Sequence, residues 1–223
     1  MLPLPTRVLD RRHAVDVIIE TVLREAPGTV TLVPTAALTN IAMAVRKEPR
    51  TAERVAEVVL MGRAVAGGNR TAAAESNIVT DPEAAHIVFG ERWPVTMVGL
   101  DLTHQALATP EVVDRIAALG TAPARFVLEV LEFFGGTYPA EQGLPHSSVH
   151  DLCAVARVID PAVMTTRRAR VTVELTGTHT HGMTVADMRA PASPACRTHV
   201  AVDLDHARFW DLVIDALDRI GEP

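Results

Sequence analysis

Residues 29–47 read Thr-Val-Thr-Leu-Val-Pro-Thr-Ala-Ala-Leu-Thr-Asn-Ile-Ala-Met-Ala-Val-Arg-Lys. The segment opens with a short β-branched apolar run that ends at Pro34, passes through a polar turn, and continues from Thr39 with apolar residues at helical spacing. This is the pattern of a buried strand, a loop and a helix. Buried strands of this kind are typical of parallel sheets, so the segment predicts an α/β fold.

The same alternation extends over the whole chain. Apolar runs predict further strands at 55–61, 95–100, 169–175, 183–188 and 198–204. Helical spacing predicts helices at 12–26, 81–91, 110–119, 122–134, 151–159 and 206–220. No internal boundary interrupts the pattern, so we expect a single α/β domain over residues 1–223, with an open, mostly parallel, doubly wound sheet flanked by helices.

Composition restricts the class of partner. The chain has 48% hydrophobic and 22% charged residues, which fits one globular domain, and its net charge of -6 disfavours nucleic acid and anionic membrane. Two cysteines, Cys153 and Cys196, are too few for a disulfide framework. No apolar run reaches signal-peptide or membrane-spanning length. We therefore expect a cytoplasmic protein with a small-molecule partner.

Polar residues gather where ligands bind in this fold class. Ligands of open α/β sheets lie outside the carboxyl ends of the strands, which directs attention to residues 35–39, 62–77 and 101–105. In the second segment, Asn69, Glu75 and Asn77 offer donors and acceptors that could together hold the hydroxyls of a sugar. The alternative is structural, with Asn69 in a left-handed turn and Glu75 solvated.

A second cluster is Ser147-Ser148-Val149-His150-Asp151, at the predicted start of a helix. Asp151 could bind a hard cation through oxygen while His150 donates a proton to a leaving group. The alternative is a capping box, in which Ser148 and Asp151 only stabilise the helix N-terminus.

Aromatic and histidine residues give two weaker signals. Phe133, Phe134 and Tyr138 lie beside two glycines, so they form either a mobile lid that stacks on a flat base or an ordinary packed segment. His179 and His181 alternate along a predicted strand end, and because no suitable third ligand is near, an exposed hairpin edge explains them better than zinc.

Taken together, several segments resemble the inosine-uridine-type, nonspecific nucleoside hydrolase family. They are Leu-Val-Pro-Thr-Ala-Ala-Leu-Thr-Asn-Ile-Ala (32–42), Val-Val-Leu-Met-Gly (58–62), Asp-Pro-Glu-Ala-Ala-His-Ile-Val-Phe (81–89), Thr-Met-Val-Gly-Leu-Asp-Leu-Thr-His-Gln-Ala-Leu (96–107), Val-His-Asp-Leu-Cys-Ala-Val-Ala (149–156) and Gly-Met-Thr-Val-Ala-Asp (182–187). The resemblance rests on their order and spacing, since no single motif is decisive.

The resemblance implies hydrolysis of the N-glycosidic bond of purine or pyrimidine ribonucleosides to ribose and free base, in ribonucleoside catabolism and purine salvage. It also implies a Ca²⁺ cofactor and a homo-oligomer, either a dimer or a tetramer. Carried over by position, Asp151 and Thr35 resemble metal ligands and His150 resembles the leaving-group acid. The substrate-binding positions are Met61, Asn69, Glu75, Asn77 and Tyr138.

One departure from the family pattern yields a rival hypothesis. Members of the family begin with a strand that ends in an aspartate cluster, and this sequence has no match to that cluster or its strand–helix units. We therefore expect an N-terminally truncated domain, with a gap where a central strand is missing. The rival hypothesis is a catalytically inactive homologue that binds nucleosides or serves as a subunit of an oligomer.

Overall fold

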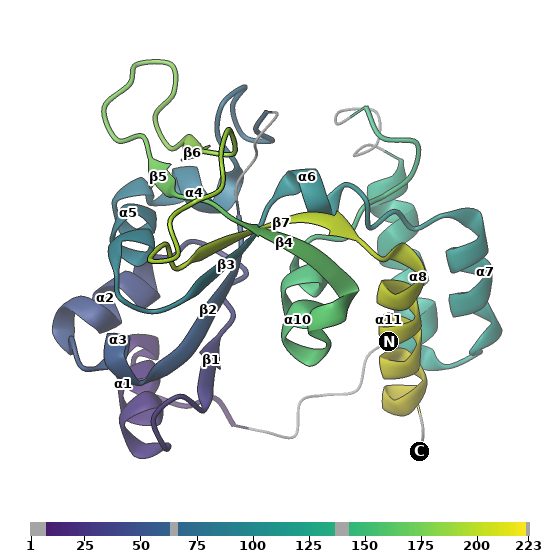
Figure 1. Cartoon of the computed structure of the whole chain (residues 1–223). Coiled ribbons are helices and arrows are strands. Elements are labelled where there is room, and N and C mark those ends of the chain that lie inside the picture. The colour runs from purple at the N-terminus through teal and green to yellow at the C-terminus, as the bar shows by residue number, and fades with distance from the viewer. Residues whose placement is uncertain (1–7, 63–66, 137–142, 222–223) are drawn as a thin grey trace.

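The central sheet has a continuous ladder of strands in the order β1-β2-β3-β7-β4. The computed structural model describes residues 8–62, 67–136 and 143–221. Within them the sheet consists of β1 (Val30–Leu32), β2 (Val55–Met61), β3 (Val95–Val98), β7 (Thr198–Leu204) and β4 (Met164–Arg168) (Figure 1). The first four strands are parallel to one another, and β4 runs antiparallel to β7. The expected mostly parallel sheet is confirmed.

The expected gap in this sheet is wrong for the described residues. β1 pairs directly with β2 and lies at one edge, so no strand position inside the ladder is empty. All three residues of β1 are partly exposed, whereas β2 ends in four consecutive buried residues. A strand that pairs on only one side keeps more of its surface in contact with solvent.

Helices cover both faces of the sheet (Figure 1). On one face, α1 (Ala14–Arg24), α2 (Thr39–Lys47) and α5 (Pro82–Gly90) pack around Val58 and Leu60. On the other, α7 (Pro110–Ala118), α8 (Ala122–Gly135), α10 (Asp151–Ile159) and α11 (His206–Gly221) pack around Val59 and Met61. Successive side chains of a strand point to opposite faces, so the run Val58 to Met61 contributes to both cores. The doubly wound arrangement follows.

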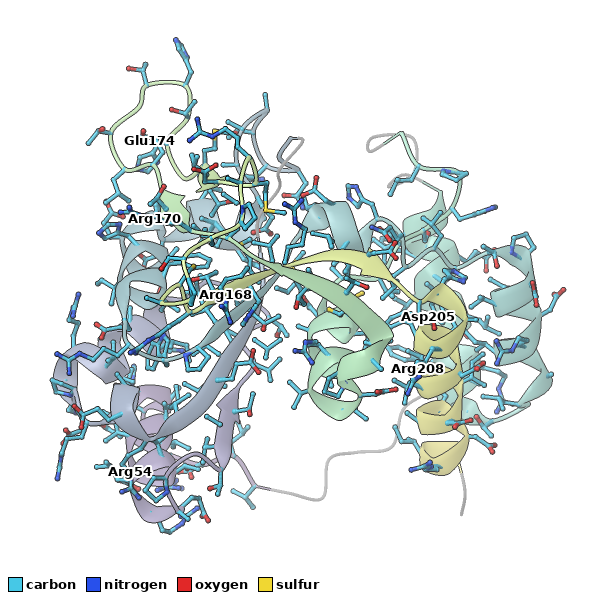
Figure 2. The ribbon with its side chains drawn as sticks, in the orientation of Figure 1. Arg54, Arg168, Arg170, Glu174, Asp205 and Arg208 are labelled. Atoms are coloured by element: carbon cyan, nitrogen blue, oxygen red, sulfur yellow. The ribbon has the colours of Figure 1, made fainter. Side chains whose placement is uncertain are left out.

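Two strands predicted from the sequence lie outside the central sheet. β5 (Val171–Val173) and β6 (Thr184–Ala186) form a separate antiparallel pair. The carboxylate of Glu174 accepts hydrogen bonds from the backbone of Thr176 at 2.8 Å and Gly177 at 3.0 Å, which folds the connection between them (Figure 2). His179 and His181 are both exposed in this connection.

Sequence analysis missed the strand β4. Its residues are Met-Thr-Thr-Arg-Arg, and only Met164 among them is buried. An edge strand with one neighbour needs no continuous apolar run, so the pattern that identified the other strands is absent here.

In the described residues, short elements stand where the sequence predicted loops or strand ends: α3 (Thr51–Arg54), α4 (Ser76–Thr80), α6 (Leu100–Thr103) and the 3₁₀ turn η1 (Pro161–Val163). Arg54 closes α3 and donates from its guanidinium to the carbonyls of Val22 at 3.1 Å and Leu23 at 3.0 Å, so it holds the end of α1 (Figure 2). Such single turns are too short to show a helical period in the sequence. α4 and α6 are the two that reach the candidate site.

Candidate active site

The ends of β1, β2 and β3 are joined at the carboxyl edge of the sheet. The Met61 N–H donates to the Pro34 carbonyl at 3.1 Å, and the Gly62 N–H donates to the Val98 carbonyl at 3.1 Å. These contacts place the residues that follow each strand side by side, and α4 and α6 lie at the same side of the sheet (Figure 1). Thr35, directly after Pro34, is exposed at this edge.

Met61, Glu75 and Asn77 form one connected group. The Asn77 side-chain amide donates to the Met61 carbonyl at 3.2 Å and lies 3.4 Å from the Met61 sulfur. Glu75 is the N-cap of α4, where its carboxylate accepts from the backbone N–H of Asn77 at 2.9 Å and of Ile78 at 3.2 Å. Glu75 is only 2% exposed, so the alternative in which it is solvated is wrong.

Asn69 and Gly62 complete the frame of this group. Asn69 Oδ1 accepts from the Ser76 N–H at 3.0 Å, which folds the loop back onto the start of α4. A Cβ at Gly62 would lie 3.0 Å from Ile78 Cδ1 and 3.2 Å from Glu75 Oε2, so a larger residue there would require these side chains to shift by a few tenths of an ångström. The structure therefore brings Met61, Asn69, Glu75 and Asn77 together, as the sugar-site interpretation requires.

His150 is held in place by backbone pairing and by a side-chain contact to Thr103. Ser148 forms an antiparallel bridge with Leu107, flanked by hydrogen bonds from Ala108 N–H to the Ser147 carbonyl at 2.8 Å and from Val149 N–H to the Ala106 carbonyl at 3.2 Å. This pairing sets the start of α10 beside α6, where Thr103 Oγ1 lies 2.7 Å from His150 Nδ1.

The environment keeps the His150 imidazole neutral at pH 7. Burial and, to a smaller extent, the neighbouring His104 ring, whose centroid lies 5.9 Å away, together lower the pKa of His150 to about 4. Burial also lowers the pKa of His104, against the opposing charge of Asp101. A neutral ring carries one N–H, and when the Thr103 hydroxyl donates to Nδ1 that proton resides on Nε2.

Asp151 is the first residue of α10, and the capping-box alternative for it is wrong. The N-cap of α10 is His150, which makes no side-chain capping hydrogen bond, and the buried Ser148 hydroxyl has no hydrogen-bond partner among the described residues. Asp151 is exposed as a residue, and the partial burial of its carboxyl group raises its pKa. Its position at the N-terminus of the helix opposes this effect, because the helix dipole stabilises the charged carboxylate.

The donor chemistry of Asp151 fits a metal ion. Within the described residues its carboxylate has no hydrogen bond or ion pair, so partial desolvation is not offset by a protein donor. A hard cation binds such carboxylate oxygens together with backbone carbonyls and water, and Thr35 offers a carbonyl at the edge of the sheet. In the described ranges no group of three or more His, Cys, Asp or Glu residues is placed to hold a metal. Asp151 and Thr35 can therefore supply part of a coordination shell.

The aromatic residues that the sequence offered as a lid are only partly described by the structure. Phe133 and Phe134 lie in the last turn of α8, with an edge-to-face ring contact at 5.3 Å. Tyr138 lies outside the described residues. The sequence did not identify Thr103 or His104 as candidate site residues, although both lie in the segment 101–105, which follows a strand where ligands of open α/β sheets bind.

Comparison with known proteins identifies the family of this chain. A sequence profile described as "Inosine-uridine preferring nucleoside hydrolase" matches residues 1–211. The inosine-uridine preferring nucleoside hydrolase of Crithidia fasciculata is 58% identical over 215 residues, which cover 96% of this chain and 68% of the relative. The corresponding protein of Leishmania major is 59% identical over 215 residues, with the same two shares covered.

A solved structure gives the same result. The purine-preferring ribonucleoside hydrolase from Gardnerella vaginalis superposes with a TM-score of 0.87 at 34% identity, covering 98% of this chain and 70% of that chain. The fold is thus that of the nucleoside hydrolases, and the relatives support a hydrolase that acts on N-glycosyl bonds. The chain belongs to the inosine-uridine preferring nucleoside hydrolase family, whose members act on ribonucleosides and bind a metal ion.

Replacing Glu75 tests the structural part of its role. Glu75→Ala leaves the N–H groups of Asn77 and Ile78 without their acceptor, so we expect a loss of about 1–3 kcal/mol in the free energy of unfolding, measured by urea denaturation. Glu83→Ala, in the exposed first turn of α5, is the matched control and should change stability by less than about 0.5 kcal/mol. Equal effects of the two substitutions would show that Glu75 does not cap α4.

Proposed function

We propose that this chain hydrolyses both purine and pyrimidine ribonucleosides with Ca²⁺ as its cofactor, releasing ribose and the free base. The observation that carries the proposal is the neutral His150 ring, held by Thr103 next to Asp151 at the edge of the sheet where Met61 and Asn77 also lie. The names of the relatives support both substrate classes, since they include an inosine-uridine enzyme and pyrimidine-specific enzymes such as that of Enterobacter.

The reaction sets three requirements. Hydrolysis of a glycosidic bond passes through an oxocarbenium-like state, so the site must fix the sugar, stabilise developing positive charge and assist the leaving group. Asn77 meets the first requirement, because its NH₂ is fixed on the Met61 carbonyl, and its Oδ1, which accepts no hydrogen bond from the described residues, can accept one from a ribose hydroxyl. Asn69 and Glu75 hold the loop and the helix start that set the position of Asn77.

His150 meets the requirement at the leaving base. As the glycosidic bond breaks, a base nitrogen gains negative charge, and an N–H at Nε2 of His150 donates to it. Thr103, bonded at Nδ1, fixes the ring orientation, and burial strengthens the hydrogen bond that the ring makes.

Asp151 and the Thr35 carbonyl would hold the metal. Calcium accepts carboxylate and carbonyl oxygens, and when bound it supplies an electrophilic centre that orients water and ribose hydroxyls. Asp151 contributes a carboxylate at the start of a helix that is itself anchored by the pairing of residues 147–149 with residues 106–108.

We further propose a single cytoplasmic domain over residues 1–223 that assembles as a homo-oligomer. Both cysteines are free, which suits a reducing compartment. Helices α10 and α11 expose Leu152, Val155, Ile159 and Ile220 on one face, and apolar surface of this kind favours association. None of the helices in the described part of the chain is long and apolar enough to cross a membrane.

Asp151 provides the test of metal-dependent hydrolysis. We expect this chain to release ribose from inosine and uridine with Ca²⁺ and to lose that activity in excess chelator. Asp151→Asn should lower kcat/KM by about 100-fold or more, because a ligand that stabilises the transition state through the metal contributes several kcal/mol. Asp114→Asn, an exposed carboxylate on α7, is the control. A folded chain without Ca²⁺-dependent release would instead be the inactive homologue.

His150 provides the test of leaving-group assistance. His150→Gln should reduce kcat for inosine by about 10²–10⁴-fold, the usual contribution of a positioned acid–base group. A 4-nitrophenyl riboside releases a stable phenolate that needs no proton, so its kcat should change little. If the substitution slows both substrates equally, His150 positions the sugar and does not assist the base.

A further inference from the structure

A cavity of about 330 Å³ lies between the end of α5, strand β5 and the segment before β7. It is at the edge of the sheet where the parallel strands begin, because Arg197 lines it and the Arg197 carbonyl accepts from the N–H of Val95, the first residue of β3, at 3.0 Å. The candidate active site lies at the opposite edge. Cavities that bind small molecules have volumes of about 300–1,000 Å³, so this one is large enough for a second ligand.

The outer edge of β5 forms one wall of the cavity. In the described part of the chain β5 pairs with β6 alone, and the Asp187 N–H donates to the Arg170 carbonyl at 3.0 Å across that pair. Backbone groups of alternate residues point to opposite sides of an antiparallel strand, so those of Val171 and Val173 point away from β6. Residues 170–173 all line the cavity, which is the pattern of a cavity that meets the edge of a strand and not one of its faces.

This strand edge is buried and still has hydrogen bonds to make. Val171 and Val173 are each 7% exposed. Beyond the pairing with β6, the backbone groups of these two residues form no hydrogen bond to any other described residue. Buried backbone groups are nearly always hydrogen-bonded. The edge presents both N–H and C=O groups, so it calls for a partner in the cavity that can accept and donate.

Two arginines give the cavity a positive charge. Arg170 lies beside α5 (Figure 2), and within the described residues its guanidinium has no ion pair. Arg197 lines the cavity as well, and its guanidinium donates to the Arg92 carbonyl, which holds the side chain in place. The lining carboxylate of Glu91 is paired with Arg46 at 2.9 Å, so its charge is offset. Guanidinium groups bind phosphate oxygens through strong, charge-assisted hydrogen bonds.

We propose that this cavity binds a sugar phosphate. The phosphate lies between the guanidinium groups of Arg170 and Arg197, where the N–H groups of the strand edge also donate to it. The sugar hydroxyls donate to the carbonyls of Val171 and Val173, and the apolar face of the sugar lies on Phe89, which lines the same cavity. A ligand without hydroxyls would leave these carbonyls unpaired. The inference goes beyond nucleoside hydrolysis, because the cavity shares no residue with the candidate active site.

Calorimetric titration of the full chain with glucose 6-phosphate tests the site. Excess chelator is present, so that the proposed metal site does not contribute. Arg170→Gln and Arg197→Gln should each weaken binding by about tenfold, because each removes charge-assisted hydrogen bonds to the phosphate. Arg219→Gln, which removes an exposed positive charge from α11, is the matched control and should change the affinity by less than about twofold. Inorganic phosphate should bind more weakly than glucose 6-phosphate, and glucose should not bind detectably.

Amide NMR of the unmodified chain gives a readout that does not depend on any variant. The backbone N–H signals of Val171 and Val173 should shift in a saturable way with glucose 6-phosphate, whereas the signal of Asn77 at the candidate active site should stay where it is. This measurement keeps the proposal testable if an arginine variant fails to fold.

Three results would overturn the proposal. They are the absence of saturable binding to the folded, unmodified chain, equal effects of Arg170→Gln and Arg219→Gln, and glucose binding as tightly as its phosphate. The titrations involve neither a metal ion nor hydrolysis. A chain that binds glucose 6-phosphate here yet releases no ribose from nucleosides would therefore contradict the proposed function alone.

Discussion

Two backbone hydrogen bonds, one on either side of the Leu107–Ser148 bridge, position the candidate catalytic residues His150 and Asp151. Through them, the segment after α6 holds the segment before α10, although about forty residues separate the two along the chain. Without this pairing, His150 would lie on an unconstrained loop before a helix. With it, the imidazole lies against Thr103 and away from water, and Asp151 begins α10 beside the carboxyl edge of the sheet.

The sugar side of the site depends on a buried carboxylate. Glu75 has polar groups to satisfy inside the protein, and the N–H groups at the start of α4 satisfy them. That contact fixes Asn77, which in turn is tied to the end of β2 through Met61. The proposed ribose-binding groups are thus rigid before substrate arrives, which lowers the entropy that ordering them would cost on binding.

The sequence alone predicted the helices and strands whose apolar residues recur with a regular period. The strands at 55–61 and 198–204 and the helices at 39–47 and 151–159 agree with the structure at both ends. The edge strand β4 and the single turns α4 and α6 were not predicted, because neither an exposed strand nor one turn of helix produces a recognisable apolar pattern in the sequence. The candidate site, too, could be predicted only in part. The sequence marked His150, but its partner Thr103 is 47 residues away, and only the folded chain shows that the two meet.

Titration of the His150 ring by nitrogen NMR is the most direct test of this account. Burial between α6 and α10 predicts a midpoint near pH 4, well below the ordinary value for histidine, so the ring stays neutral throughout the physiological range. A midpoint near 6.5 would contradict the account, because it would mean that the ring is solvated and that the pairing of residues 106–108 with residues 147–149 does not hold His150 against Thr103.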